Sequence, residues 1–275
     1  MHPGRRRPLP YNEPLHSEKA ARREGSGALP EIHQLETLEE FADVVRLQQE
    51  IWGFQDVELL PLRLFIVASE IGGQVLGAYD GPKLVAFCLC IPGLKPSGKS
   101  YLHSQMLGVL SPYRNTGLGR SMKLKQREFA LAAGVDLIEW TFDPLEIKNA
   151  FFNIERLGAI VCRYLPNQYG TTTSHLHGGL PTDRLVAEWW IQSPRAHVCS
   201  SGDGAPLPPP VPAQARISVP ADIGELRKRE PSRARDVQRS LGEQFEEHFQ
   251  AGLTVTGFER SEQAGTYLLG KWESK

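Results

Sequence analysis

The fold is decided by residues 101–134, which read YLHSQMLGVLSPYRNTGLGRSMKLKQREFALAAG. The first part carries the apolar pairs Met106-Leu107 and Val109-Leu110, which are typical of a β-strand, and Ser111-Pro112 predicts a turn after it. A helix is predicted to follow, because Leu118, Met122, Phe129 and Ala133 fall roughly on one helical face. The stretch therefore predicts a strand, a turn and a helix in direct succession.

The turn itself, residues 114–119, predicts an anion-binding site. The first backbone N–H groups of a helix have no acceptor within the helix, and the helix dipole is positive at that end. Gly117 and Gly119 carry no Cβ, so a phosphate can approach the backbone closely. A phosphate-bearing ligand is the first functional inference.

The composition is that of an ordinary globular protein. The chain has 275 residues, of which 40% are hydrophobic and 23% charged, and its net charge is −1. This balance predicts no nucleic-acid partner, and no apolar run is long enough to cross a membrane. Arg5, Arg6 and Arg7 are not followed by the apolar segment of a secretion signal. The four cysteines form no CxxC pair, so we expect reduced thiols in a cytoplasmic protein.

Local signals predict the elements before the central stretch. Thr37 and Glu40 form a capping box that starts a helix, and Gly53 ends it. A short strand at 31–35 precedes this helix, and a second helix is predicted at 61–71. Asp80-Gly81 predicts a hairpin between strands 74–79 and 83–91, and we expect a loop at 92–100. Because both faces of strand 83–91 are apolar, we expect it to be central in the sheet.

After the central stretch we expect three strands and a helix, which complete an α/β fold of mixed α+β type with helices on both faces of a sheet. The strands are 136–142, 159–164 and 184–191, and the helix is 149–157. Further along, a charged helical region at 222–250, interrupted at Pro231, and strands at 253–259 and 266–272 form a C-terminal extension. The predicted divisions are a disordered leader (1–29), a main domain (30–192), a Pro/Gly/Ser-rich linker or loop (193–213) and an extension that packs on the main domain or a second subunit (214–275).

The turn and its setting resemble the GNAT superfamily of N-acetyltransferases. The coenzyme A signature of that family, Arg/Gln-x-x-Gly-x-Gly/Ala, is matched by Arg114, Gly117 and Gly119. A second family feature, Asn-Ala followed by a helix-ending glycine, is matched by Asn149-Ala150 and Gly158. The resemblance covers about residues 30–192, and NAFFNIERLGA with the later GLPTDR is similar to a poorly characterised bacterial branch of predicted acetyltransferases. It implies a mixed, mostly antiparallel sheet that is splayed at the coenzyme A site.

The resemblance also implies an acyl-coenzyme A-dependent N-acyltransferase in which an amine attacks the thioester directly. The expected donor is acetyl-coenzyme A, with succinyl as an alternative acyl group, and the expected acceptor is a small amine or amino acid. No metal is required, and a homodimer is compatible with the sequence. The backbone of 115–120 would hold the pyrophosphate, strand residues would pair with the pantetheine arm, and Asn149 would hydrogen-bond that arm. The implied coenzyme A ligands are Leu107, Val109, Arg114, Asn115, Thr116, Gly117, Leu118, Gly119, Arg120, Asn149 and Asn153.

The catalytic groups are less well defined by the sequence. Many relatives carry a tyrosine as the acid for the leaving thiolate at the position that Ile154 occupies here. Tyr164, Tyr169 or water remain as alternatives for this role. Glu139 lies in the middle of an apolar strand, where a carboxylate is costly unless it is paired or functional. Glu139 is therefore the first candidate for the base or for a substrate ligand, with a paired structural carboxylate as the alternative, and His103 is the second candidate.

The sequence gives weaker signals for other kinds of site and for one other function. His175 and His177 are too few ligands for a metal site, and His177 or Arg184 in that loop is instead a candidate for a substrate contact. The sequence lacks the glycine spacing of a Rossmann dinucleotide site and the Gly-x-Ser-x-Gly of a serine nucleophile. The alternative function is a catalytically degenerate module that binds acyl-coenzyme A as a sensor or scaffold.

Overall fold

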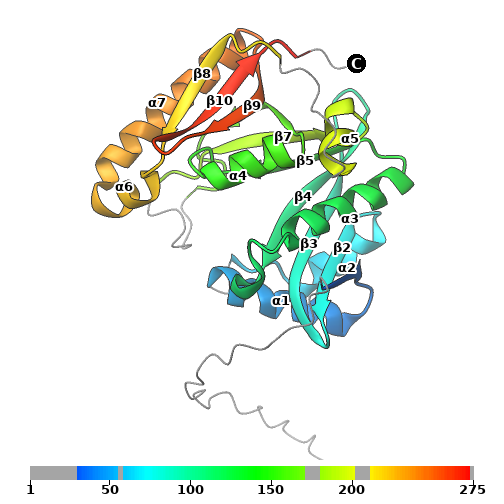
Figure 1. The fold of residues 1–275 in the computed structure, drawn as a ribbon. Coiled ribbons are helices and arrows are strands. Elements are labelled where there is room, and N and C mark those ends of the chain that lie inside the picture. The colour runs from blue at the N-terminus through cyan, green and yellow to red at the C-terminus, as the bar shows by residue number, and fades with distance from the viewer. Residues whose placement is uncertain (1–29, 55–57, 171–179, 202–210, 273–275) are drawn as a thin grey trace, which may run out of the picture.

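A ten-stranded sheet with the strand order β1-β2-β3-β4-β5-β7-β6-β9-β10-β8 runs through the computed structural model (Figure 1). The structure describes residues 30–54, 58–170, 180–201 and 211–272. Each neighbouring pair of strands is antiparallel except β4 and β5, which are parallel. The strands are β1 (Glu31–Gln34), β2 (Gln74–Asp80), β3 (Lys83–Leu94), β4 (Ser100–Val109), β5 (Leu137–Phe142), β6 (Ile160–Leu165), β7 (Arg184–Trp190), β8 (Ala215–Pro220), β9 (Thr254–Arg260) and β10 (Ala264–Gly270).

Helices cover both faces of this sheet, as the sequence predicts. On β3, Phe87 packs against Trp52 and Phe65 of the first two helices, whereas its neighbour Cys88 faces Gln126 of α3. Adjacent strand residues point to opposite faces, so α1 and α2 lie on one face and α3 on the other. The helices are α1 (Leu38–Trp52), α2 (Leu62–Glu70), α3 (Leu118–Ala132), α4 (Ile147–Phe151), α5 (Pro194–Ser201), α6 (Ile223–Arg229) and α7 (Pro231–Gln250), with a 3₁₀ turn at Ser111–Tyr113 and a π-helical turn at Phe152–Arg156 that continues α4.

The local sequence signals form the elements that they predict. The Thr37 side chain accepts from the backbone of Glu40, and the Glu40 carboxylate accepts from the backbone of Thr37, which completes the capping box of α1. Gly53 ends the helix in the left-handed conformation, with φ of 64°. Both faces of β3 are buried, which confirms that this strand is central.

Three segments differ from the sequence-based expectation. The loop predicted at 92–100 is shorter, because β3 continues to Leu94 and β4 begins at Ser100. Helix α5 occupies the start of the predicted linker, where a weakly amphipathic sequence gives little signal. Strand β8 was not predicted, because it is short and forms only by pairing with the distant β10. Residues 1–29 of the predicted leader lie outside the described residues.

The C-terminal residues extend the main sheet and share its core. β9 pairs with β6 at Val255 and Val161, so the strands of the extension continue the same sheet. Helix α7 contributes Phe245, whose ring lies 6.0 Å from that of Tyr164 and 5.1 Å from that of Tyr267. The Tyr267 hydroxyl donates to the carbonyl of Pro144 at 2.7 Å. These contacts join elements on both sides of the predicted linker.

We expect Phe245→Ala to destabilise the N-terminal part of the chain as well as α7. The substitution should lower the free energy of unfolding by about 3–5 kcal/mol, because Phe245 is fully buried between two tyrosines. Tryptophan fluorescence during urea unfolding reports on this, since Trp52, Trp140 and Trp189 lie far from α7 in sequence. The exposed Glu243→Ala on the same helix is the control, with a change within about 0.5 kcal/mol. A tryptophan transition that stays at the wild-type midpoint would contradict the shared core.

Candidate functional site

The two central parallel strands separate soon after they meet. β4 and β5 pair only at Leu102 with Ile138 and at His103 with Glu139. The pairing of β3 with β4 shifts register after this point, so that Gln105 is an extra residue in β4. β4 continues to Val109 beside β3 alone, and its other edge is open toward β5. The open edge of β4 confirms the splayed sheet that the family resemblance implies. Unpaired strand edges offer backbone donors and acceptors to an extended ligand.

The open strand leads directly into the predicted anion-binding turn. Asn115 has a φ of 63° and Gly117 a φ of 94°, so the backbone turns through two left-handed residues before α3 begins. The Thr116 hydroxyl donates to the carbonyl of Tyr113 at 2.8 Å, and the Tyr113 hydroxyl donates to Asp80 at 2.6 Å. The turn is thereby tied to the β2–β3 hairpin.

The N-terminus of α3 presents free space in front of its backbone donors. A Cβ added at Gly117 or Gly119 would meet no atom within 4 Å. The N–H groups of the first helical turn, at Leu118, Gly119 and Arg120, have no acceptor inside the helix. The geometry fits a phosphate or pyrophosphate group.

Two arginines of the turn have partners elsewhere. The Nε of Arg114 donates at 3.0 Å to the carbonyl of Val109, a group that the sequence assigns to the pantetheine arm. The Nη2 of Arg120 donates at 2.5 Å to the carbonyl of Cys199 and at 3.3 Å to that of Ser200, at the end of α5. The Arg120 side chain is therefore held by α5, and its contribution to anion binding is the backbone N–H.

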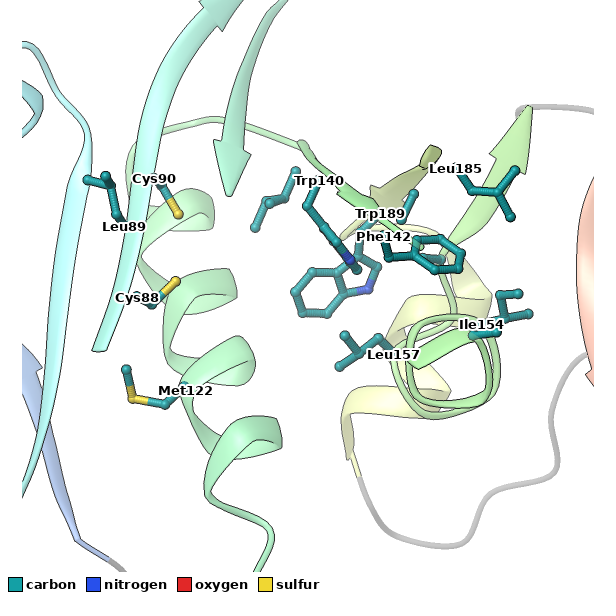
Figure 2. Close-up of a cluster of buried hydrophobic side chains, with 14 of the residues drawn as sticks. Cys88, Leu89, Cys90, Met122, Trp140, Phe142, Ile154, Leu157, Leu185 and Trp189 are labelled. Carbon is teal, nitrogen blue, oxygen red and sulfur yellow. The ribbon is translucent and has the colours of Figure 1, made fainter. Parts of the chain in front are cut away.

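The segment from α4 through the π-helical turn lies on the same face of the sheet as α3. Asn149 is exposed on α4, whereas Asn153 is buried in the π-helical turn. Figure 2 shows Trp140 and Trp189 between α3 and the segment that carries Ile154. The Ile154 side chain is fully buried, so this position carries core packing and no acid.

The candidate base Glu139 is a paired carboxylate on the opposite face of the sheet. Its side chain is only 4% exposed and forms ion pairs with Lys95 and with Nη2 of Arg163, the latter at 2.7 Å. The Nε of Arg163 also lies 3.6 Å from Glu188. Burial of the Arg163 guanidinium acts to lower its pKa, but the negative charges of Glu139 and Glu188 outweigh burial and raise the pKa of Arg163. Glu139 therefore has the charged partners that a buried carboxylate requires.

His103 lies beside Glu139 in the register of the two strands. Burial lowers the pKa of His103 below 6.5, although Glu139 acts in the other direction. A neutral imidazole at neutral pH has a free lone pair and can accept a proton from an amine. His103 therefore has the protonation state that a general base requires, whereas Glu139 is engaged in ion pairs with Lys95 and Arg163.

The two candidate tyrosines lie on different faces. The Tyr164 hydroxyl donates to Asp183, and the Tyr164 ring stacks on Phe245 of α7. Burial is the main cause that raises the pKa of Tyr164, and the hydrogen bond to Asp183 is the next. Tyr169 is exposed, and its hydroxyl lies 2.9 Å from Thr141. Thr141 shares a face of β5 with Glu139. The structure thus places His103, Glu139 and Tyr169 on one face of the sheet and Tyr164 on the other.

Lys95 and Arg163, the partners of Glu139, were not predicted from the sequence. Lysines and arginines near strand ends carry no pattern that distinguishes them from solvated residues, and the pairing depends on contacts between distant segments. Among the described residues, no group of three histidine, cysteine, aspartate or glutamate side chains is arranged to hold a metal ion. No helix in the described ranges has the length and apolar character to span a membrane. His175 and His177 lie outside the described residues.

The structure of this chain is similar to solved structures of proteins described as acetyltransferases. No protein-family model and no curated protein sequence matches this chain. Solved structures that it resembles include a Desulfovibrio desulfuricans protein assigned to the GNAT family of acetyltransferases (13% identity, 58% of this chain and 98% of that chain, TM-score 0.46). Another is a Salmonella typhimurium protein with acetyl-CoA (13% identity, 60% of this chain and 96% of that chain, TM-score 0.49). A third is the ribosomal-protein-S18-alanine N-acetyltransferase of Escherichia coli (16% identity, 60% of this chain and 96% of that chain, TM-score 0.47).

We expect His103 to make folding sensitive to acid. Because its pKa is lowered in the folded state, the unfolded chain takes up a proton first as the pH falls below 6.5. The wild type should therefore lose stability as the pH falls through the folded pKa, and His103→Gln should lose less. Urea unfolding at about pH 7.5 and about pH 5.5 measures the difference. His197→Gln, at an exposed position on α5, controls for removal of a histidine, and parallel pH curves for His103→Gln and wild type would disprove the assignment.

Proposed function

We propose that this chain is an acyl-coenzyme A-dependent N-acyltransferase of the GNAT type. The observation that supports it most is the continuity of the open β4 edge with the glycine turn at the start of α3. A pantetheine arm needs an extended hydrogen-bonding edge, and its pyrophosphate needs an anion site at one end of that edge. The backbone of Leu107 and Val109 would pair with the arm, and the N–H groups around Gly119 would bind the pyrophosphate.

One adjustment accompanies binding in this proposal. Arg114 donates to the Val109 carbonyl and would have to release it to the pantetheine arm. Arg114 is exposed, so its guanidinium is free to turn toward the phosphates once that carbonyl has another donor. Asn149, exposed on α4, would contact the arm from the other side of the opening. Asn153 is buried in the π-helical turn, so we assign it to positioning that turn.

The chemistry that we assign to the site is direct transfer. The acceptor amine would approach the face of the sheet that carries His103 and Glu139, and His103 would accept the proton that the amine loses. Glu139, held by Lys95 and Arg163, would keep the charge balance beside His103. The acceptor that we propose is a small amine or amino acid, and acetyl is the proposed acyl group, with succinyl as the alternative.

The second candidate is a sensor or scaffold that binds acyl-coenzyme A without turning it over. The buried Ile154, at the position of the usual tyrosine acid, favours this reading. The two candidates share the coenzyme A site and differ only in whether the thioester is cleaved.

We expect Gly119→Glu to weaken coenzyme A binding by at least about 100-fold, because like charges brought together cost several kcal/mol. Gly119 is helical and faces open space, so the variant should fold, and a helix former in place of glycine favours the helix. Isothermal titration calorimetry with coenzyme A measures the affinity. Gly119→Gln is the matched control, and its loss should be smaller because it adds bulk without charge. Equal affinities for wild type and Gly119→Glu would place the phosphates elsewhere.

We expect thiol release from acetyl-coenzyme A to rise when an amine acceptor is supplied. A panel of primary amines and amino acids, with a thiol reagent as the readout, tests transfer directly, and His103→Gln should lower the rate by about 100-fold or more because it removes the general base. If coenzyme A stabilises the protein against heat but no member of the panel raises thiol release, the sensor is favoured. Failure of millimolar coenzyme A to stabilise the chain would reject both candidates.

A further inference from the structure

Lys123 is a buried amine in the second turn of α3. The residue is 3% exposed, and its Nζ donates to Ser104 Oγ at 2.9 Å and to Gln126 Oε1 at 3.1 Å. The same Nζ lies 3.8 Å from the centroid of the Trp140 ring, as in a cation–π contact. No ion pair with Lys123 occurs in the part of the chain that the structure describes.

The position of this amine in the sheet is specific. His103 and Glu139 form the last pair between β4 and β5. Ser104 and Trp140 are the residues that immediately follow, one on each strand. Lys123 contacts both of them, so its ammonium lies at the vertex where the strands begin to separate.

Neighbouring side chains hold the amine in place. Gln126 accepts from Lys123 and donates with its amide nitrogen to Ser104 Oγ at 3.1 Å and to Cys88 Sγ at 3.0 Å. Cys88 and Cys90 face α3 from β3 (Figure 2). None of these partners is a carboxylate, although the neighbouring Cys90 side chain first, and then the charge of Lys123, lower the pKa of the Cys88 thiol.

A stabilising role does not account for this lysine. Removing an ammonium from water costs several kcal/mol, and such a group is normally compensated by a carboxylate. A hydrophobic residue of similar length would fill the same space without that cost. A buried cation with hydrogen-bond partners and a ring, but with no carboxylate partner among the described residues, suits a site where negative charge develops during a reaction.

We propose that Lys123 is the acid that protonates the coenzyme A thiolate when the acyl group leaves. This inference rests on the proposed acyltransfer function. An arm that enters along the open edge of β4 from the turn would end at the vertex, where its sulfur would meet the ammonium. Lys123 would thus supply the proton that a tyrosine at position 154 would supply in many relatives.

Each bond and proton in the proposed transfer has a donor and an acceptor. The acceptor nitrogen bonds to the thioester carbon, and its proton passes to His103. The carbon–sulfur bond then breaks, its electron pair stays on sulfur, and a proton moves from Nζ to sulfur. The products are the amide, the coenzyme A thiol, a protonated His103 and a neutral Lys123. After the thiol leaves, His103 gives its proton to water and Lys123 regains one, so the proton count is restored.

The direct test is the ionisation of the coenzyme A thiol in the binary complex, which needs no acceptor. Thiolate absorbance is followed against pH, with desulfo-coenzyme A as the blank so that the protein's cysteines cancel. An adjacent ammonium should lower the pKa of the bound thiol by about one unit or more relative to free coenzyme A. Lys123→Met, which keeps the length of the side chain, should remove this shift, whereas the half-exposed Lys125→Met on the same helix should retain it.

A second readout uses turnover of acetyl-coenzyme A with the best amine of the panel. Lys123→Met should lower kcat about 100-fold while the affinity for coenzyme A stays within about threefold. Burial lowers the pKa of Lys123, with the charges of ionised Cys88 and Cys90 opposing it. The wild-type kcat should therefore fall on the alkaline side, and this limb should be absent in Lys123→Met. The remaining groups around Lys123 are Ser104, Gln126, Trp140 and, from the other face of β4, His103.

The outcomes separate the two proposals. If wild type binds no coenzyme A, the proposed function and this inference both fail. If wild type binds coenzyme A but the bound thiol ionises as in free solution, Lys123 is not at the sulfur. The inference then fails while the proposed binding stands. This result needs only the wild type, so it holds even if Lys123→Met does not fold. A normal alkaline limb in a folded Lys123→Met would also overturn the inference.

Discussion

The separation of β4 from β5 is the constraint on which the rest of the candidate site depends. A parallel pair that breaks after two residue pairs leaves strand backbone unsatisfied inside a protein, which is costly unless water or a ligand pairs with it. The extra residue Gln105 opens the strands at this place, because a bulge bends a strand and increases its twist. The glycine turn is useful only because the open edge of β4 leads to it.

The two faces of the sheet at this opening carry different chemistry. One face holds His103 and Glu139 with the cations that pair with Glu139, and it suits proton transfer to and from an incoming amine. The other holds Lys123 with Trp140, and it suits stabilisation of charge on a leaving group. Alternation along the strands is the reason: consecutive residues His103 and Ser104, like Glu139 and Trp140, point to opposite faces. An acyl group drawn to the vertex would therefore have a base on one face and an acid on the other.

The sequence predicts this arrangement in part. Signals carried by a few adjacent residues, such as the capping box at Thr37 and the glycine turn at 117–119, were sufficient because they act through local geometry. Features that depend on distant contacts were not predictable: β8 forms only against β10, and Arg163 finds Glu139 only once the sheet has formed. The helix after the turn shows the limit clearly. Its predicted apolar face includes Ala133, which is exposed, whereas Lys123 and Gln126 are buried in its middle, and no periodicity argument places a lysine there.

Helix α5, which the sequence suggested would be linker, ties the two sides of the opening together. Its last carbonyls accept from Arg120 in the first turn of α3, and its Arg195 donates at 2.8 Å to the carbonyl of Ile154 in the π-helical turn. A π-helical turn leaves backbone groups without their usual partners, so the Arg195 contact stabilises a conformation that the local sequence alone would not favour. Because α5 contacts both segments, a change in the distance between them would break hydrogen bonds on at least one side. The distance between the start of α3 and the π-helical turn is therefore constrained by α5, a helix that lies beyond the region of family resemblance.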